Sequence, residues 1–549
     1  MNSKEGCPLP ARRALCSRQG KNMSDIINHY VQQAAKGFMN RREFIGRLGA
    51  LGVAAASANS LLASAACAEG PKKGGLLRAG LQGGASTDSL DPALAASSVP
   101  NNVLTAYGDL LVEVDTHGQI VPRLAESVEA SADAKTWTFK IRKGVEFHNG
   151  KTMTPEDVLK TMQRHSNEDS QSGALGIMRG IESMKVDGDY FSVTLDTPNA
   201  DLPYLMADYH LVVQPDGGMD APASGIGCGP YTLEVNEPGA RHAFKKFANY
   251  WDEGRGHADE IEILVLNDDT ARTAALQSGQ VHFINRVAPK IAKLLGRAPG
   301  LRIESIAGRG HYCFLMHCDT APFASNDLRM ALKLAIDRQE MVDKVLRGFG
   351  SVGNDSPINA AYPLFSDDIE QRAYDPDQAR HYYQKSGHDG PVVMKVSDTA
   401  FPGAVDAAQL FQQSASTAGI PLQIERVPSD GYWSEVWNKE PFCASYWGGR
   451  PVQDQMFSTA YKSDADWNDT RFKRDDFDTL LLQAKGELDT VKRTALYREM
   501  SVMVGNEGGA IIPMFNDFID AVSEQVGGWE NDSGGGMMYD GALVKTWLL

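Results

Sequence analysis

The stretch "TWTFKIRKGVEFHNGKTMTPEDV", residues 136–158, begins with a segment that alternates between apolar and polar side chains. Trp137, Phe139 and Ile141 occupy every second position of this segment. Because successive side chains of a strand point to opposite faces, the alternation predicts a strand with one face in a core.

The second half of the same stretch predicts a helix. Thr154 stands at the cap position, Pro155 at the first helical position, and Asp157 three residues after the cap. Two other regions also combine strands with helices: residues 258–284 predict strand, helix and strand, and residues 391–428 predict a βαβ unit. We therefore expect an α/β fold.

Residues 311–350 predict a strand, a turn and a single long helix. Ser325 is the expected N-cap of that helix, and Gly348 is expected to end it. The pattern therefore predicts one long helix between these two residues.

The composition indicates a globular protein with more than one lobe. The chain has 549 residues, of which 42% are hydrophobic and 23% are charged. This is more chain than one core usually serves, so two or three lobes are expected. The 54 Lys and Arg residues against 70 Asp and Glu residues give a net charge of -16. A nucleic-acid partner requires a basic face, so this balance argues against one.

The sequence lacks the common motifs of catalysis. Neither G-x-S-x-G nor H-E-x-x-H occurs. Gly144 and Gly150 enclose five residues where a phosphate loop has four, and Asn149 replaces the second glycine of such a loop. His311 and His317 lack a carboxylate or thiol at zinc-ligand spacing. We predict no enzymatic activity, no catalytic residue, no metal site and no cofactor.

Residues 1–68 have the character of an export signal. The arginine pair at 41–42 precedes a long stretch of Ala, Gly, Ser and Leu, and it resembles a twin-arginine signal. The sequence Ala-Cys-Ala at 66–68 fits a cleavage site, so Glu69 is the expected first residue of the mature chain. This signal predicts a periplasmic location.

Three alternatives concern the same segment. It could stay attached as an uncleaved anchor. Cys67 could carry a lipid, which is disfavoured because Ser64 stands where a lipoprotein signal has Leu. Translation could also begin at Met23, since the residues before it are unlike the start of an export signal.

Four cysteines remain after the predicted cleavage: Cys228, Cys313, Cys318 and Cys443. Cys313 and Cys318 are an odd number of residues apart in the predicted strand. Their side chains therefore point to opposite faces and do not form a disulfide with each other. An oxidising compartment permits a disulfide between Cys443 and one of them without requiring it.

Seven stretches of the chain together resemble one protein family, the family 5 extracellular solute-binding proteins. These are the dipeptide- and oligopeptide-binding components of ABC importers. The similarity runs from about residue 74 to about residue 545. The stretches are "LDPA" (90–93), "GQIVPRLAES" (118–127), residues 136–158, "GCGPYTL" (227–233), "NYWD" (249–252), "APFASNDLRMALKLAIDRQEMV" (321–342) and "YDPDQARHYYQKSG" (374–387).

The resemblance implies a two-lobed periplasmic binding protein fold of the type II kind, with an extra subdomain in the first lobe and a ligand cleft between the lobes. Lobe I is then expected at residues 69–118, 226–310 and 506–549. The extra subdomain is expected at 119–225 and lobe II at 311–505. The lobes of such proteins close around the ligand by hinge motion.

The resemblance also implies a function without catalysis. The protein would capture peptides or peptide-like solutes in the periplasm and deliver them to an ABC permease and its ATPases, acting as a monomer. An anionic non-peptide solute, such as an opine, a glycoside, a chelate or a cell-wall fragment, is the alternative. A periplasmic hydrolase is a further alternative from another class, against which the missing nucleophile motifs speak.

The stretch "ASYWGGRPVQDQ", residues 444–455, resembles a loop that reads Gly-Trp-x-x-Asp in peptide-binding members, in which the Asp binds the α-ammonium group of the ligand. Trp447 keeps the aromatic position, but Arg450 stands where the Asp would be. A guanidinium repels an ammonium and binds a carboxylate or phosphate. We therefore predict that Arg450 binds an anionic group of the ligand and that Trp447 stacks on the ligand. Alternatively, Arg450 pairs with Asp454, or Asp454 itself takes the ammonium.

Further candidates complete the expected ligand-binding set. Tyr446 and Trp433 stand among glycines and polar residues and offer aromatic walls. Val99 and Phe515 are the other two expected contacts. Trp437 and Trp467 are instead expected to lie in the core.

Overall fold

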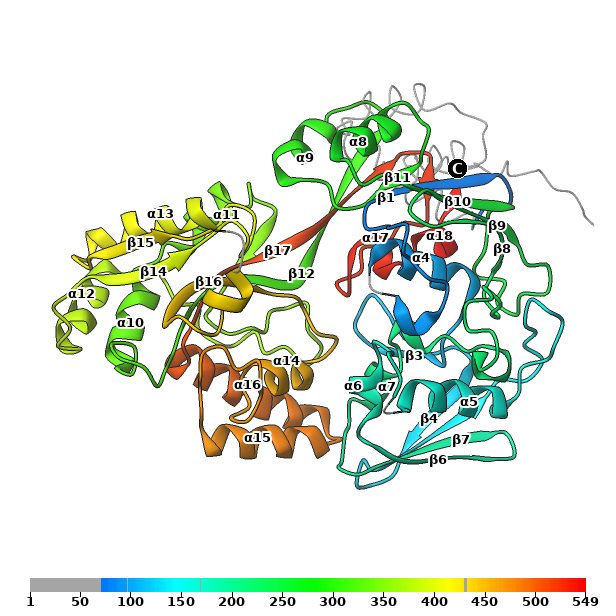
Figure 1. The fold of residues 1–549 in the computed structure, drawn as a ribbon, viewed down its shortest axis with the longest axis horizontal. Coiled ribbons are helices and arrows are strands. Elements are labelled where there is room, and N and C mark those ends of the chain that lie inside the picture. Colours follow the sequence, from blue (N-terminus) through cyan, green and yellow to red (C-terminus); the bar gives the residue numbers. More distant parts are fainter. Residues whose placement is uncertain (1–70, 96, 168, 429–431) are drawn as a thin grey trace, which may run out of the picture. The chain divides into compact units, whose positions relative to one another are not determined.

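The computed structural model describes residues 71–95, 97–167, 169–428 and 432–549 (Figure 1). The expected signal segment, with its arginine pair, its cleavage site and Met23, lies outside these residues. The side chain of Trp433 also lies outside the description. In the part of the chain that the structure describes, no helix is long and apolar enough to cross a membrane.

The main sheet combines parallel and antiparallel strands. Its hydrogen-bonded order is β15-β14-β16-β12-β17-β11-β1-β10-β9-β8, and β13 pairs with β17 beside this path. Helices cover the sheet, so the predicted α/β fold class is confirmed. We call the elements around β1 and β10 the first lobe and those around β14 and β16 the second lobe.

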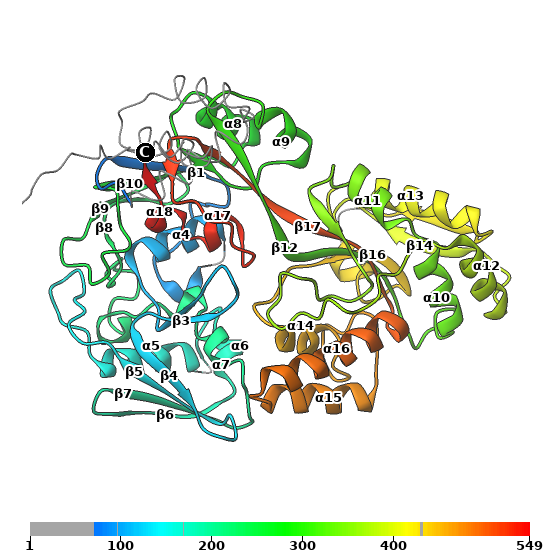
Figure 2. The same ribbon diagram turned by 180° about the vertical axis from the view of Figure 1, so that it is seen from behind.

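Two long antiparallel strands pass from one lobe to the other, and Figures 1 and 2 show them side by side. They are β12 (Leu301–Met316) and β17 (Ala510–Ser523). At one end β17 pairs with β11, and at the other end β12 pairs with β16. Their mutual register shifts between Ala307 and His311. The hydrogen-bonded backbone between the lobes is thus irregular at this point.

The first lobe packs helices against its part of the sheet. Its core residues come from β1, β10, α4 and the C-terminal helices. The elements are β1 (Leu76–Leu81), α4 (Ser98–Tyr107), β2 (Val112–Val114), β3 (Ile120–Pro122), β8 (Tyr231–Glu237), β9 (Arg241–Lys246), β10 (Glu260–Val265), α8 (Asp269–Gln277), β11 (Phe283–Ile284), α9 (Pro289–Leu295), β18 (Val526–Gly527), α17 (Gly536–Tyr539), α18 (Ala542–Lys545) and β19 (Trp547–Leu548).

A separate four-stranded sheet, β4-β5-β7-β6, forms the subdomain together with three helices. Trp137, Phe139 and Ile141 on β5 are buried, and Thr154 and Asp157 form a reciprocal capping box on α5, so both predictions for residues 136–158 are confirmed. The elements are β4 (Ala125–Ala130), β5 (Thr136–Ile141), α5 (Pro155–Ser166), α6 (Leu175–Met178), β6 (Ile181–Asp187), β7 (Tyr190–Leu195) and α7 (Leu202–Leu205).

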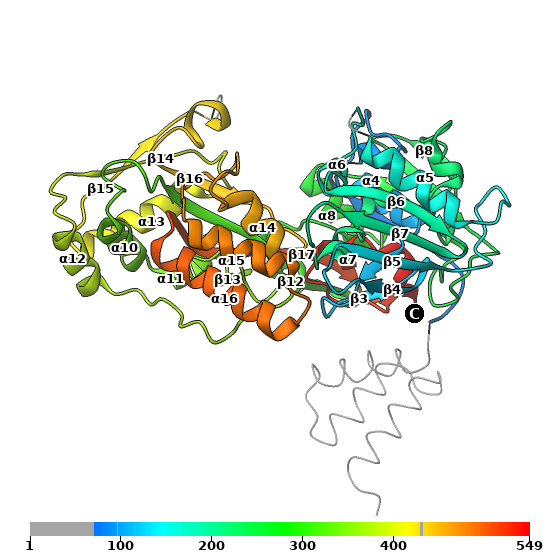
Figure 3. The same ribbon diagram turned by 90° about the horizontal axis from the view of Figure 1, so that it is seen from below.

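The second lobe has a core on each face of its strands. Helices α10 to α13 bury one face and α14 to α16 the other; Figure 3 shows the latter three as one group. The elements are α10 (Asn326–Leu334), α11 (Arg338–Lys344), β13 (Gly350–Val352), α12 (Pro376–Lys385), β14 (Val392–Val396), α13 (Ala404–Thr417), β15 (Leu422–Arg426), a π-helical turn (Tyr432–Val436), β16 (Phe442–Trp447), α14 (Gln453–Ala460), α15 (Asp475–Gly486) and α16 (Thr490–Glu507).

The prediction of one long helix after Ser325 is wrong. The segment forms two helices, because Asp337 leaves the helical conformation and its side chain accepts a hydrogen bond from the amide of Glu340. Asp337 therefore caps a second helix in the middle of the apolar pattern. The βαβ unit is confirmed, since β14 and β15 are parallel and α13 lies between them in sequence.

The four described cysteines are free thiols. Cys443 lies opposite Leu315 in the β12–β16 ladder, while Cys313 lies opposite Ser445. The structure thus forms no disulfide among Cys228, Cys313, Cys318 and Cys443.

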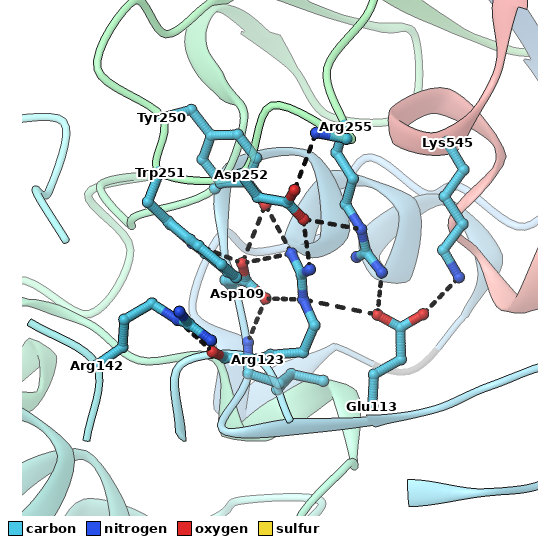
Figure 4. A network of polar contacts seen from close by, with 12 residues as sticks. Asp109, Glu113, Arg123, Arg142, Tyr250, Trp251, Asp252, Arg255 and Lys545 are labelled. Carbon is cyan, nitrogen blue, oxygen red and sulfur yellow. Dashed lines mark hydrogen bonds and ion pairs between the residues drawn. The ribbon is translucent and has the colours of Figure 1, made fainter. Parts of the chain in front are cut away.

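A dense polar network, which we call the joint, surrounds the point where the chain enters the subdomain (Figure 4). Arg123 donates from Nη2 to Asp109 Oδ2 at 3.0 Å and from Nη1 to Asp252 Oδ2 at 2.5 Å. Glu113 pairs with Arg255 and, at 2.6 Å, with Lys545 of α18. These ion pairs fasten the entry of the subdomain to the first lobe.

Trp251 adds an aromatic layer to the joint. Its ring lies 4.6 Å from the guanidinium carbon of Arg123 and 4.4 Å from that of Arg142, which belongs to the subdomain. Its indole N–H donates to Asp109 Oδ2 at 3.2 Å. Guanidinium stacking of this kind adds to the ion pairs.

Candidate functional site

A cavity of about 1110 Å³ lies among both lobes and the crossing strands. The first lobe contributes the start of α4, the loop from Asn285 to Lys290 and the glycine-rich segment at 534–540. The second lobe contributes residues 345–349 and the end of β16. This volume is slightly larger than the roughly 300–1,000 Å³ that is usual for small-molecule sites.

The glycine-rich segment folds tightly over a buried carboxylate. Residues Met537 to Asp540 all have positive φ angles, the left-handed region that residues other than glycine rarely adopt. Oδ2 of Asp520 on β17 accepts the amide N–H of Met537 at 2.5 Å. A side chain at Gly536 would place its Cβ 3.3 Å from both carboxylate oxygens of Asp520, so this glycine permits the approach.

Three carboxylates face this side of the cavity. Burial raises the pKa of Asp520 to about 7 and that of Asp540 to about 6, although Asn101 and Asn102 donate to Asp540. Burial also raises the pKa of Asp517, which accepts a hydrogen bond from Ser305 at 2.6 Å. None of the three forms an ion pair with a described cation, and a cationic ligand group placed here would favour the charged form of these carboxyl groups.

Three cations line other parts of the same cavity: Arg286 after β11, Lys290 in the first turn of α9, and Arg347 after α11. All three are exposed, and none pairs with a carboxylate among the described residues. The charge of Arg286 lowers the pKa of Asp540, but the cavity is lined by ionisable groups of both signs that form no ion pair with one another among the described residues.

Tyr446 and Trp447, at the end of β16, both line the cavity but differ in exposure. Tyr446 is 49% exposed and Trp447 only 6%. The indole N–H groups of Trp447 and Trp437 both donate to Asp469 Oδ2, at 3.1 and 2.9 Å. Trp447 is thus fixed by a buried carboxylate 22 residues further along the chain.

The neighbouring Trp467 lies 6.0 Å from the rings of both Trp447 and Trp437. It is 51% exposed, so its expected place in the core is wrong. Burial raises the pKa of Asp469, which these rings surround, to about 7.

Arg450 directly follows the two glycines that line the cavity and is not itself among the lining residues. Its Nη1 donates to the carbonyl oxygens of Gly448 and Gly449 at 3.2 and 3.3 Å, and its guanidinium lies 5.7 Å from the ring centre of Trp447. Burial lowers its pKa, and no described carboxylate pairs with it. The alternative of an ion pair between Arg450 and Asp454 is therefore not observed.

The structure places three other expected ligand contacts away from the cavity. Asp454 is buried on α14, where it faces Asp201 rather than Arg450. Val99 is buried under Gly84, and Phe515 packs its ring 5.3 Å from that of His311. Among the members of the expected set whose side chains the structure describes, Tyr446 and Trp447 alone line the cavity.

Sequence reasoning missed the carboxylates of β17 and of the C-terminal segment. Asp517 and Asp520 look like ordinary polar positions of a strand. The run of three glycines at 534–536 before Asp540 was the one available signal of a close backbone approach.

Residues 119–469, more than half of the chain, match the family model "Bacterial extracellular solute-binding proteins, family 5 Middle". The chain belongs to this family. Among its relatives is the glutathione-binding protein GsiB of Salmonella choleraesuis (strain SC-B67). The two sequences are 25% identical over 491 residues, and the match covers 84% of this chain and 93% of GsiB.

Solved structures confirm the two-lobed α/β fold of this family 5 protein. The periplasmic binding protein DppA of Helicobacter pylori in complex with peptide STSA has a TM-score of 0.69 at 20% identity, covering 88% and 99% of the two chains. The binding protein AgaA from A. tumefacien R10 in complex with agropinic acid has a TM-score of 0.68 at 23% identity, covering 86% and 99%.

The part of this family 5 protein that the structure describes offers no metal site. It contains no group of three or more His, Cys, Asp or Glu side chains arranged to hold a metal ion.

Proposed function

We propose that the protein captures peptides or peptide-like solutes for import, as the binding component of an ABC transporter. The observation that supports this most is the cavity with unpaired charges of both signs. A peptide carries an ammonium at one end and a carboxylate at the other, and each requires the opposite charge nearby. The similarity to GsiB and DppA, which bind glutathione and a peptide, points to the same class of solute.

We further propose that the protein acts in the periplasm together with the membrane components of an importer. Residues 1–68 would direct export through the twin-arginine route and be cleaved, releasing the protein as a monomer into the periplasm. The permease and ATPases of the importer would be its partners, with no nucleic acid involved. The double replacement Arg41→Lys and Arg42→Lys should leave uncleaved precursor in the cytoplasm. Normal export of this variant would contradict the twin-arginine route.

We propose that Tyr446 and Trp447 contact the body of the solute in the cavity and that Arg450, which directly follows the lining glycines, attracts its anionic group. Nε and Nη2 of Arg450 have no described partner, so part of the guanidinium fork is available. The replacement Arg450→Ala should weaken binding of a peptide with a free C-terminus and not of its amidated form. Equal binding of both forms by this variant and by the unaltered protein would rule out the role.

An anionic non-peptide solute is the second candidate. The unpaired Arg450 and the fold similarity to AgaA, whose structure holds agropinic acid, favour it. We propose no catalytic step for either class.

Calorimetry with trialanine, glutathione and agropinic acid tests both candidates. We expect one site per chain for at least one of these solutes. A hundredfold excess over the dissociation constant should then add about 2.7 kcal/mol to the free energy of unfolding. Mass spectrometry after incubation should recover the solute intact. No binding of any of the three, or a hydrolysed product, would overturn the proposal.

A further inference from the structure

The subdomain touches the second lobe through a buried ion pair. Asp201, at the start of α7, pairs with Arg493 of α16, and the hydroxyl of Tyr497 donates to Asp201 Oδ2 at 3.4 Å. Asp201 is 3% exposed and Arg493 is 5% exposed. This contact lies outside the cavity and outside the joint.

Backbone groups extend the contact. The amide N–H of Ala200 donates to the carbonyl oxygen of Lys485 at 2.8 Å. A Cβ placed on Gly486, the last residue of α15, would lie 3.2 Å from Cβ of Pro198. The loop before α7 therefore rests directly on the turn between α15 and α16.

The second lobe holds Arg493 in place by itself. Nε of Arg493 donates to the carbonyl oxygen of Ala484 at 3.0 Å, and Nη2 donates to the hydroxyl of Tyr497 at 3.0 Å. Both partners belong to α15 and α16. The guanidinium is thus pre-oriented before Asp201 arrives, which lowers the entropy cost of forming the pair.

The ion pair between Asp201 and Arg493 takes no residue from the strands that connect the lobes. The chain passes between the lobes through β12 and β17. A rotation of one lobe about these strands changes the distance between Asp201 and Arg493. Formation of the pair and closure of the lobes are therefore coupled.

A second carboxylate stands beside the pair. Asp454 of α14 is buried, and its Oδ1 has no hydrogen-bond partner. Its nearest charged groups are Asp201, Lys485 and Arg493. The cluster thus holds two carboxylates, and one of them is incompletely satisfied.

We propose that Asp201, Arg493 and Tyr497 form a latch that joins when the lobes close and sets how long the solute is retained. These residues touch no part of the cavity, so they act on affinity through the closed conformation. The latch rests on the proposed function only in that a bound solute is what favours closure.

A pair of engineered cysteines can measure directly how often the latch is formed. Cβ atoms of a disulfide lie about 3.5–4.5 Å apart, close to the spacing that Pro198→Cys and Gly486→Cys would have. We expect this double variant to form a disulfide under mild oxidation, even without added solute. Adding Asp201→Asn should slow its formation about threefold or more, because the closed state is less populated.

Asp368→Asn is the matched control in the same cysteine background. Asp368 pairs with Arg498, which lies on α16 like Arg493, but both residues belong to the second lobe and are exposed. This control should leave the rate of disulfide formation unchanged. Equal rates in the Asp201→Asn and Asp368→Asn backgrounds, or no disulfide at all in the double variant, would overturn the latch.

Trialanine, glutathione and agropinic acid separate the latch from the proposed function. Each solute that binds should speed disulfide formation. If none binds while Asp201→Asn still slows the reaction, the latch stands and the proposed solute class fails. If a solute binds without changing the rate, the latch fails and the proposed function stands. Arg493→Gln, checked for folding by its melting temperature, should repeat the effect of Asp201→Asn.

Discussion

The subdomain contacts the first lobe at the joint and the second lobe at the latch, and these two polar clusters differ in how completely their charges are paired. At the joint, Arg123 is shared by Asp109 and Asp252, and Glu113 has two cationic partners (Figure 4). At the latch, one guanidinium meets Asp201 while Asp454 keeps an unpartnered oxygen.

The titration behaviour of the two clusters follows the same division. Burial alone would raise the pKa of Glu113, but Arg255 and Lys545 hold it down to about 2. The pKa of Asp454 is raised to about 6, by burial first and by Asp201 second. Charge at the joint is thus stabilised, whereas charge at the latch is costly.

This difference separates a permanent contact from a reversible one. A buried cluster in which every charge is satisfied is costly to open, because each separated charge is left unpaired. A cluster that contains an unsatisfied carboxylate gains less free energy when it forms, so it opens more easily. The comparison indicates that the subdomain moves together with the first lobe, and that the lobes separate at the latch.

The largest effect is expected from Arg123→Gln at the joint. The change leaves the carboxylates of Asp109 and Asp252 without their main partner, and breaking buried pairs costs about 3–5 kcal/mol. Calorimetric unfolding should show a markedly lower melting temperature. An unchanged melting temperature would mean that the joint is as dispensable as an exposed ion pair.

A smaller effect, on binding rather than on folding, is expected from Asp201→Asn at the latch. Loss of a buried interfacial pair acts mainly on dissociation, so stopped-flow release of whichever of trialanine, glutathione and agropinic acid binds should be about tenfold faster. The melting temperature without solute should fall much less than in Arg123→Gln. A fall as large as that of Arg123→Gln would erase the distinction between the two clusters.

The smallest effect concerns pH. An exposed aspartate titrates near 3.9, so a closed state with the pKa of Asp454 at about 6 takes up protons when it forms. Binding should therefore tighten, by roughly a few-fold, as the pH falls from about 7.5 to about 5.5. Calorimetry across this range checks the slope.

Asp454→Asn provides the control for that slope. It should bind more tightly than the unaltered protein at about pH 7.5 and show a flatter pH dependence. A slope that is unchanged in this variant would assign the effect to other buried carboxylates, such as Asp520.

Local elements of the fold were predictable from the sequence, and distant contacts were not. The strand and capped helix at 136–158 depend on alternation and on a cap within a few residues. The break at Asp337 was also local, since Glu340 follows it at capping-box spacing, but the apolar pattern around it continued.

The partners of the candidate residues lie far along the chain. Trp447 is held by Asp469, and Asp454 faces Asp201, which precedes it by about 250 residues. No spacing rule connects such positions. The loop at 444–455 could therefore be recognised as part of a binding site, while the environments of its individual side chains depended on the tertiary structure.

Hydrogen–deuterium exchange tests the central claim most directly, that solute binding closes the latch and leaves the joint unchanged. The measurement compares the protein alone with the protein saturated by whichever of trialanine, glutathione and agropinic acid binds in calorimetry. Exchange should slow in segments 198–205 and 484–497 and stay the same in segments 108–124 and 249–256. Equal protection of all four segments, or no protection of 198–205 at saturation, would contradict the account.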